Sequence, residues 1–244
     1  MSRHIVIIGA SSGIGLKAAL HFAAEGWKVG IAARREGQLI AVKNQYPQNV
    51  EYEVIDITAD DASAKILKLI DRLGGVDIYF HAAGTGWSNP TLRLDKEMTT
   101  IATNACGFVT SVVTAYRHFA DNNLKGRIAA VTSVAGTKGI GISASYSATK
   151  RFDSTYLEAL GQLAHIDKAD ISFTDIRPGF IRTDLLDPDR SYPMLMTLDY
   201  ASKRIFKAIV SGGPVVYVDW RWGLLTFFWK LIPPCLWRRL PVKL

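Results

Sequence analysis

Tyr146 and Lys150 form the pair of side chains in this sequence that is best suited to proton transfer. A free phenol has a pKa of about 10 and exchanges protons poorly near neutral pH. A lysine four residues along a helix lies one turn away on the same face. At an effective dielectric constant of about 20, a cation about 5 Å away lowers the phenol pKa by about two units. The pair therefore predicts a general acid and base, although this spacing alone often arises by chance.

A glycine-rich segment follows the first apolar run, residues 5–8, and reads Gly9-Ala10-Ser11-Ser12-Gly13-Ile14-Gly15. A helical pattern begins directly after it. Glycines here let the chain turn sharply and bring backbone N–H groups against a phosphate, toward which the helix N-terminus directs its partial positive charge. The segment predicts a pyrophosphate-binding loop for a dinucleotide. The alternative is an ordinary strand–turn–helix connection.

The end of the second apolar run indicates which dinucleotide the loop would hold. An acidic residue at this position hydrogen-bonds the 2′-hydroxyl of the NAD ribose. This chain has Ala33-Arg34-Arg35 instead, so two guanidinium groups are available for a 2′-phosphate, and Ser11 adds a hydroxyl donor. We therefore expect NADP(H) to be preferred over NAD(H). The alternative is that both arginines form a solvated strand end.

An alternation of strands and helices must position these residues. Seven short and mostly continuous apolar runs are typical of strands covered on both faces: 5–8, 29–32, 52–55, 78–80, 128–131, 171–173 and 215–218. Helical patterns lie between them, at roughly 13–25, 36–45, 60–73, 95–120, 145–164 and 199–211. The pattern predicts an α/β fold, a single-domain doubly wound parallel sheet of about seven strands with helices on both faces. We expect a catalytic domain over 1–220 and an extension, not a second domain, over 221–244.

The chain resembles the short-chain dehydrogenase/reductase family over nearly its whole length. The glycine loop is followed in order by Asp56, His81-Ala82-Ala83-Gly84, Asn104, Ser133, Tyr146-x-x-x-Lys150, Pro178-Gly179 and Thr183. The resemblance implies a Rossmann-type oxidoreductase that moves a hydride between nicotinamide and a carbonyl or an alcohol. The family often has Asn-Asn-Ala-Gly where this chain has His81 and Ala82. Hydrogen bonds from those two positions are therefore not expected, and His81 is predicted to be a packed residue at a strand end.

The resemblance also implies roles for individual residues. Tyr146 would exchange the proton, Ser133 would hydrogen-bond the substrate oxygen, and Lys150 would also hold the nicotinamide ribose. Asn104 would support a water chain that resupplies the proton. Pro178 and Gly179 would close over the carboxamide of the nicotinamide. The complete expected cofactor-binding set is Gly9, Ser11, Ser12, Gly13, Ile14, Gly15, Arg34, Arg35, Asp56, Ile57, Ala83, Gly84, Tyr146, Lys150, Pro178, Gly179, Ile181 and Thr183.

The segment 184–198 follows the sixth strand and is expected to form the substrate lid, because ligands of such sheets bind beyond the carboxyl ends of the strands. Its apolar and methionine-rich composition predicts a hydrophobic or adaptable pocket, lined by Leu185, Leu186, Tyr192, Met194, Leu195 and Met196. The alternative is that these side chains pack on the core or on a partner subunit.

The last 24 residues carry five basic residues and no acidic one, so they supply five of the seven net positive charges. Tryptophan, phenylalanine and leucine are mixed with them, and the uninterrupted apolar stretch, 223–229, is far too short to span a bilayer. Two interpretations stay open. The tail forms a peripheral contact with anionic lipid headgroups, or it is buried between subunits. The resemblance implies a homo-dimer or tetramer, with 95–120 and 145–164 as the candidate interface.

Composition argues against several other classes of protein. Two cysteines cannot build a disulfide framework, and no targeting segment precedes the first strand, so we expect a cytoplasmic protein, in one interpretation at the membrane surface. No metal is expected, because no cluster of ligating side chains has suitable spacing and hydride chemistry needs none. Removing the tail's five charges from the total of +7 leaves +2, which argues against a nucleic-acid binder. The remaining alternative is a non-catalytic NADP(H)-binding sensor of the same fold.

Overall fold

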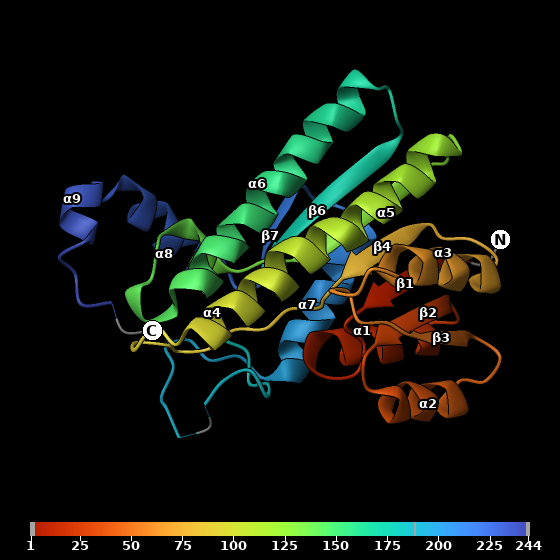
Figure 1. Cartoon of the computed structure of the whole chain (residues 1–244), viewed down its shortest axis with the longest axis horizontal. Helices are drawn as coiled ribbons and strands as arrows, with labels where there is room; N and C mark the ends of the chain where they lie inside the picture. Colours follow the sequence, from red (N-terminus) through yellow and green to blue (C-terminus); the bar gives the residue numbers. More distant parts are fainter. Residues whose placement is uncertain (1–2, 188, 243–244) are drawn as a thin grey trace.

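The computed structural model describes residues 3–187 and 189–242 and is built around one seven-stranded parallel sheet (Figure 1). The strand order is β3-β2-β1-β4-β5-β6-β7. The strands are β1 (His4–Ile8), β2 (Lys28–Ala33), β3 (Val50–Val54), β4 (Ile78–His81), β5 (Gly126–Val131), β6 (Ile171–Arg177) and β7 (Val215–Tyr217). The direction of winding reverses between β1 and β4, which places a ligand crevice beyond their carboxyl ends. The predicted doubly wound sheet is confirmed.

Helices cover both faces of the sheet and enclose two apolar cores. One core joins the sheet to α1 (Gly13–Ala24), α2 (Glu36–Gln45) and α7 (Leu198–Ser211), and the other joins it to α3 (Ala62–Leu73), α5 (Phe108–Asp121) and α6 (Ala144–Ile166). Alternate β1 residues enter opposite cores, Ile5 and Ile7 on one face and Val6 and Ile8 on the other. This two-sided burial is the physical reason for the continuous apolar runs in the sequence.

The structure is helical throughout the expected span 95–120, with a change of helix type in the middle. This helical region consists of α4 (Leu94–Ile101), a π-helical segment over Ala102–Gly107, and α5. The side-chain amide of Asn104 exchanges two hydrogen bonds with the backbone of Thr85, at 2.7 and 2.8 Å. This long-range contact accompanies the change in helical geometry, and local periodicity does not encode it. Single π-turns of this kind often occur at functional sites.

The C-terminal segment forms two short helices, α8 (Trp220–Leu231) and α9 (Pro234–Trp237), at one end of the molecule beyond β7 (Figure 1). Two hydrogen bonds fix them to the loop that follows β5. Lys138 Nζ donates to the carbonyl of Ile232, and Trp237 Nε1 donates to the carbonyl of Gly139, each at 2.8 Å. Of the helices in the described part of the chain, none is long and apolar enough to cross a membrane. Lys243, counted above among the basic residues, lies outside the described residues.

Candidate active site

A cavity of about 570 Å³ is lined by residues that directly follow six of the strands, β1 to β6. The carboxyl ends of parallel strands meet at one edge of the sheet, so residues far apart in the sequence converge there. All the sequence-predicted site residues line this cavity except Gly15 and Asn104, which lie behind its wall. The fold therefore brings the glycine loop, the strand ends and the helix that carries Tyr146 together, as expected.

The glycine loop leaves no room for side chains at two of its positions. A Cβ at Gly9 would lie 2.5 Å from the backbone nitrogen of Ala83, and one at Gly15 would lie 2.3 Å from the carbonyl oxygen of Gly9. Gly9 also has a φ of +88°, which L-residues with side chains rarely adopt. The loop thus packs closely against the residues that follow β4, and α1 begins at Gly13, so that its N-terminal residues Gly13 and Ile14 line the cavity. This arrangement fits a pyrophosphate.

Arg34 and Arg35 are both exposed and line the cavity next to the glycine loop. Arg35 Nε donates to Ser11 Oγ at 3.2 Å, so the guanidinium and the hydroxyl already lie together. Asp56 lies on the neighbouring wall, where hydrogen bonds from the backbone and hydroxyl of Thr58 lower the pKa of its carboxyl, with a smaller contribution from Arg34. Both guanidinium groups remain accessible to an added phosphate.

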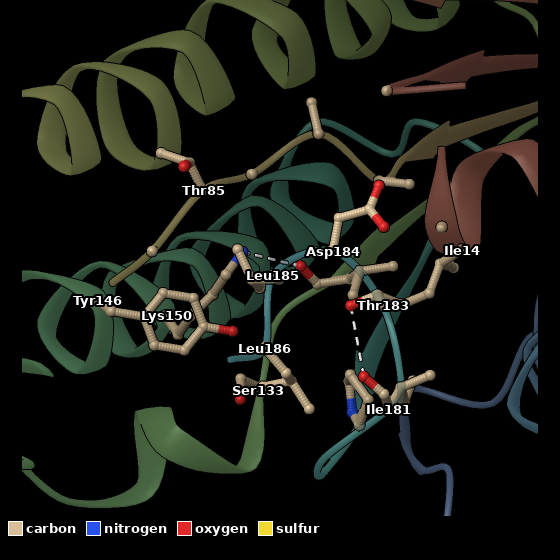
Figure 2. Close-up of a pocket in the computed structure, with 18 of the residues that line it drawn as sticks. Ile14, Thr85, Ser133, Tyr146, Lys150, Ile181, Thr183, Asp184, Leu185 and Leu186 are labelled. Carbon is tan, nitrogen blue, oxygen red and sulfur yellow. Dashed lines mark hydrogen bonds between the residues drawn. The ribbon is translucent and has the colours of Figure 1, made fainter. Parts of the chain in front are cut away.

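Tyr146, Lys150 and Ser133 gather on one side of the cavity, with Ile181 and Thr183 across from them (Figure 2). Lys150 is 4% exposed, and its ammonium donates to the Val131 carbonyl and to Asp153 Oδ2, both at 3.0 Å. Burial on its own would lower the pKa of Lys150. The negative charge of Asp153, and that of Tyr146 when ionised, outweigh burial and raise it. The ammonium is therefore held charged beside the phenol.

Ser133 is positioned as the N-cap of the short helical turn Val134–Thr137. Its Oγ accepts a hydrogen bond from the backbone N–H of Ala135 at 3.1 Å. A hydroxyl has one donor and two acceptor sites, so the proton of Ser133 stays available for an oxygen in the cavity.

The backbone of residues 84–86 packs against one face of the Tyr146 ring. A Cβ at Gly86 would lie 2.3 Å from Tyr146 Cδ2, so this backbone packs directly against the ring. Asn104 clamps Thr85 through the two hydrogen bonds described above, and its Nδ2 also lies 3.2 Å from Thr149 Oγ1. Asn104 thus anchors this segment, while its role in a water chain stays a prediction.

His81 is packed at the end of β4, as predicted. It is 1% exposed and lies edge-on to the ring of Phe108, with a centroid distance of 5.1 Å. Burial, with a smaller contribution from the charge of Lys150, lowers the pKa of His81 to about 3. The imidazole is consequently neutral at physiological pH and lies behind the cavity wall rather than in it.

The sequence interpretation did not identify Phe180, Trp222 and Trp229 as lining residues of the cavity. Both tryptophans belong to the tail, for which the sequence left contact with lipid headgroups and burial between subunits open. The structure instead buries Trp222 to 1% exposure against Phe180, at a centroid distance of 5.6 Å. A Cβ at Gly179 would lie 2.0 Å from Trp222 Nε1, so α8 closes one side of the cavity. The helical spacing of Trp222, Thr226 and Trp229 places them on a different face of α8 from its exposed apolar residues, and this spacing could have indicated that they are buried or half-buried.

The expected substrate lid divides into two parts. Leu185, Leu186 and Tyr192 line the cavity, whereas Met196 is 4% exposed, packs into the core and bridges to Ile181. Position 188 lies outside the described residues. Across the described ranges there is no group of three or more His, Cys, Asp or Glu side chains arranged for a metal ion.

The parallel sheet, the glycine loop and the Ser–Tyr–Lys wall together define a dinucleotide-binding oxidoreductase. The family model "short chain dehydrogenase" matches residues 3–192, and the chain belongs to this family. An uncharacterized oxidoreductase of Myxococcus xanthus is 31% identical over 238 residues, which cover 95% of this chain and 93% of that protein. The protein is thus an alcohol or carbonyl oxidoreductase of the short-chain type.

Solved structures support the fold assignment. ElxO with NADP bound has a TM-score of 0.77 at 22% identity and covers 90% of this chain and 98% of its own. The 3-ketoacyl-(acyl-carrier-protein) reductase of Brucella melitensis, complexed with NADH, has a TM-score of 0.77 at 24% identity, with coverage of 89% and 96%. At this identity the likeness concerns the fold.

Proposed function

We propose that this protein is an NADP(H)-dependent reductase of an apolar carbonyl compound, with Tyr146 as the proton donor. The observation that carries the proposal is the arrangement of Tyr146, Ser133 and the charged Lys150 on one cavity wall, opposite Ile181 and Thr183. When bound, a reduced nicotinamide supplies the hydride. The remaining chemistry is the handling of the oxygen and its proton by this chain.

Two groups act on that oxygen in the proposed reaction, and a third acts on the proton donor. The Ser133 hydroxyl donates a hydrogen bond to the carbonyl and stabilises the negative charge that develops on it. Tyr146 gives its proton to the same oxygen. The buried Lys150 ammonium stabilises the negative charge of the phenolate that is left.

The preference for NADP(H) follows from the end of β2. Ala33 offers no carboxylate to a ribose 2′-hydroxyl, while Arg34 and Arg35 lie beside Ser11 at the cavity rim. A 2′-phosphate there gains charge-assisted hydrogen bonds that NADH cannot make. Lys150 is assigned to the nicotinamide ribose, and Pro178, Gly179 and Thr183 to the carboxamide.

An apolar substrate follows from the side chains around the reacting end of the cavity. Phe180, Leu185, Leu186, Trp222 and Trp229 line it, and two of them belong to α8 in the tail. Apolar lining with few polar groups favours a ligand of the same character.

Oxidation of NADPH across ketones, aldehydes, keto-sugars and 3-ketoacyl compounds tests the proposal, run in parallel with Tyr146→Phe. We expect turnover to be highest for apolar carbonyls and to fall at least about 100-fold in the variant. Tight NADPH binding without turnover of any compound would favour the alternative of a cofactor-binding sensor. An unchanged rate in Tyr146→Phe would remove the mechanism.

We further propose that α8 and α9 rest on an anionic membrane surface. An outward stripe of α8, consisting of Trp220, Leu224, Phe227, Phe228 and Leu231, is 53–68% exposed. These residues recur with the spacing of one helix face, and Arg221, Lys230, Arg238 and Arg239 lie among or beyond them. Such a face suits the headgroup region, and it would place the apolar cavity next to a source of lipid-like substrate.

Sedimentation with liposomes tests this contact. We expect binding to phosphatidylserine-containing vesicles, weaker binding to phosphatidylcholine alone, and loss of binding when Leu224, Phe227 and Phe228 are all changed to Ser. Ile166→Ser is a matched control, since this residue is 67% exposed at the far end of α6. Lipid-independent self-association that disappears in the triple variant would instead identify the stripe as a subunit interface.

The chain is also proposed to form a homo-dimer or tetramer through α4, α5 and α6. Met98, Phe152 and Leu163 are exposed apolar residues of α4 and α6. Light scattering of the purified protein gives the subunit number, and a monomer would contradict the proposal.

A further inference from the structure

Asp153 is a carboxylate buried against the Lys150 ammonium. The two residues are three positions apart on α6, so they share a helix face. Asp153 Oδ2 lies 3.0 Å from Lys150 Nζ, the side chain is 0% exposed, and Oδ1 has no hydrogen-bond partner within the described residues. A buried and incompletely satisfied carboxylate opposes folding unless a nearby cation holds it.

Among the titratable groups near the pair, Lys150 is the cation that compensates the negative charge of Asp153. His81, from β4, is neutral because burial and the charge of Lys150 lower its pKa to about 3. Asp175, from β6, is itself paired with Arg177 at 2.6 Å and accepts a hydrogen bond from Thr132. Burial and, to a smaller extent, the charge of Asp175 raise the pKa of Asp153, while Lys150 lowers it, and the net result is a pKa of about 6. Asp153 is therefore predominantly ionised at neutral pH.

The hydrogen bonds of Lys150 limit the number of N–H donors that its ammonium can offer to other groups. An ammonium has three N–H donors. One is given to the Val131 carbonyl and one to Asp153, which leaves one for the side of Tyr146 and the cofactor. The negative charge of Asp153 also offsets part of the field that Lys150 exerts on Tyr146.

We propose that Asp153 is a positioning residue, which fixes the Lys150 ammonium beside Tyr146 and offsets part of the positive charge that acts on the phenol. The inference rests on the proposed function, because it concerns the proton donor of that reaction. Keeping the phenol protonated over a wider pH range favours carbonyl reduction, in which Tyr146 must begin as the acid.

The size of the effect follows from the helix geometry. Tyr146 and Asp153 are seven residues apart, which corresponds to about 10 Å along the axis of α6. A unit charge at this distance, at an effective dielectric constant of about 20, moves a pKa by about one unit. Removing the charge of Asp153 is thus expected to lower the pH at which Tyr146 ionises by about one unit.

Asp153→Asn tests the inference, with two readouts. The first is the alkaline limb of the pH profile for NADPH-dependent reduction. The second is the ultraviolet absorbance titration of Tyr146 in cofactor-free protein, obtained by subtracting Tyr146→Phe in each background. We expect both to move about one unit toward lower pH in Asp153→Asn, and neither to move in Asp153→Glu, which keeps the charge. Glu158→Gln is the matched control, because it removes an exposed carboxylate from the same helix.

The outcomes separate the inference from the proposed function. An unmoved Tyr146 titration in a folded Asp153→Asn protein would show that the pair is only structural and would overturn the inference. Full activity of Tyr146→Phe would refute the proposed function, while the absorbance titration would still decide the role of Asp153. If Asp153→Asn does not fold, Asp153→Leu provides the same loss of charge with an apolar side chain of similar size, and the same shift is expected.

Discussion

Substitution of Gly86 by alanine should move the Tyr146 ring without touching the cofactor loop. The added Cβ would lie 2.3 Å from Cδ2 and 2.9 Å from Cε2 and Cγ of Tyr146. Carbon atoms pack at about 3.5–4.0 Å, so the ring or the 84–86 backbone must shift by about 1.2 Å. Gly86 is not among the glycines with positive φ, so alanine is compatible with its backbone and the steric contact dominates.

A displacement of about 1 Å from the reactive geometry costs about 100-fold in rate, which corresponds to about 2.7 kcal/mol in activation free energy. We therefore expect kcat for NADPH-dependent reduction to fall by about that factor in Gly86→Ala. The Kd for NADPH, measured by fluorescence titration, should stay within about threefold of the wild-type value, because the phosphate-binding residues lie elsewhere.

Gly37→Ala is the matched control for this prediction. Gly37 is the second residue of α2, and a Cβ there would meet nothing within 4 Å. This variant should keep the wild-type kcat and gain about 0.5–1 kcal/mol in the free energy of unfolding. A kcat for Gly86→Ala within threefold of the wild type would show that the ring tolerates the shift, and the argument that its position is critical would be wrong.

Two further predictions concern cofactor choice and acid stability. Changing Arg34 and Arg35 together to Ala should weaken NADPH binding by at least about tenfold and leave NADH binding nearly unchanged. The reason is that charge-assisted hydrogen bonds to a 2′-phosphate are worth about 1.5–3 kcal/mol each. Isothermal titration measures both affinities, and equal losses for the two dinucleotides would contradict this prediction. The pKa of His81 is about 3 in the folded state, below its ordinary value of 6.5, so between these pH values His81 takes up a proton when the protein unfolds. The free energy of unfolding should therefore fall as the pH drops from 6.5 toward 3, by up to about 1.4 kcal/mol per pH unit. Urea unfolding of His81→Phe at several pH values should lack this part of the slope, and an identical slope in both proteins would rule out His81 as its source.

Most of the fold was predictable because its signals are local. The continuous apolar runs, the glycine loop and the order of the polar markers each lie within a few residues of sequence, and parallel topology then brings them to one sheet edge. The predicted boundaries of α1, α6 and α7 agree with the structure to within two residues.

The remainder depends on long-range contacts, and periodicity can indicate which helix face is buried but not which residues it packs against. Trp222 reaches the cavity by packing against Gly179 and Phe180, about forty positions earlier in the chain. The π-helical turn at Asn104 accompanies its hydrogen bonds with Thr85. Asp153 was missed because a carboxylate on a helix is usually solvated, and only the packed structure places it against Lys150.

The central claim is that a hydride passes to a carbonyl carbon while the hydroxyl of Tyr146 protonates the oxygen beside it. Single turnover with NADPH deuterated at the reactive nicotinamide carbon, followed by mass spectrometry of the alcohol formed, tests this most directly. We expect deuterium at the carbinol carbon with the wild-type protein, and a rate of transfer at least about 100-fold lower in Tyr146→Phe at saturating cofactor. Transfer at the wild-type rate in that variant would contradict the account.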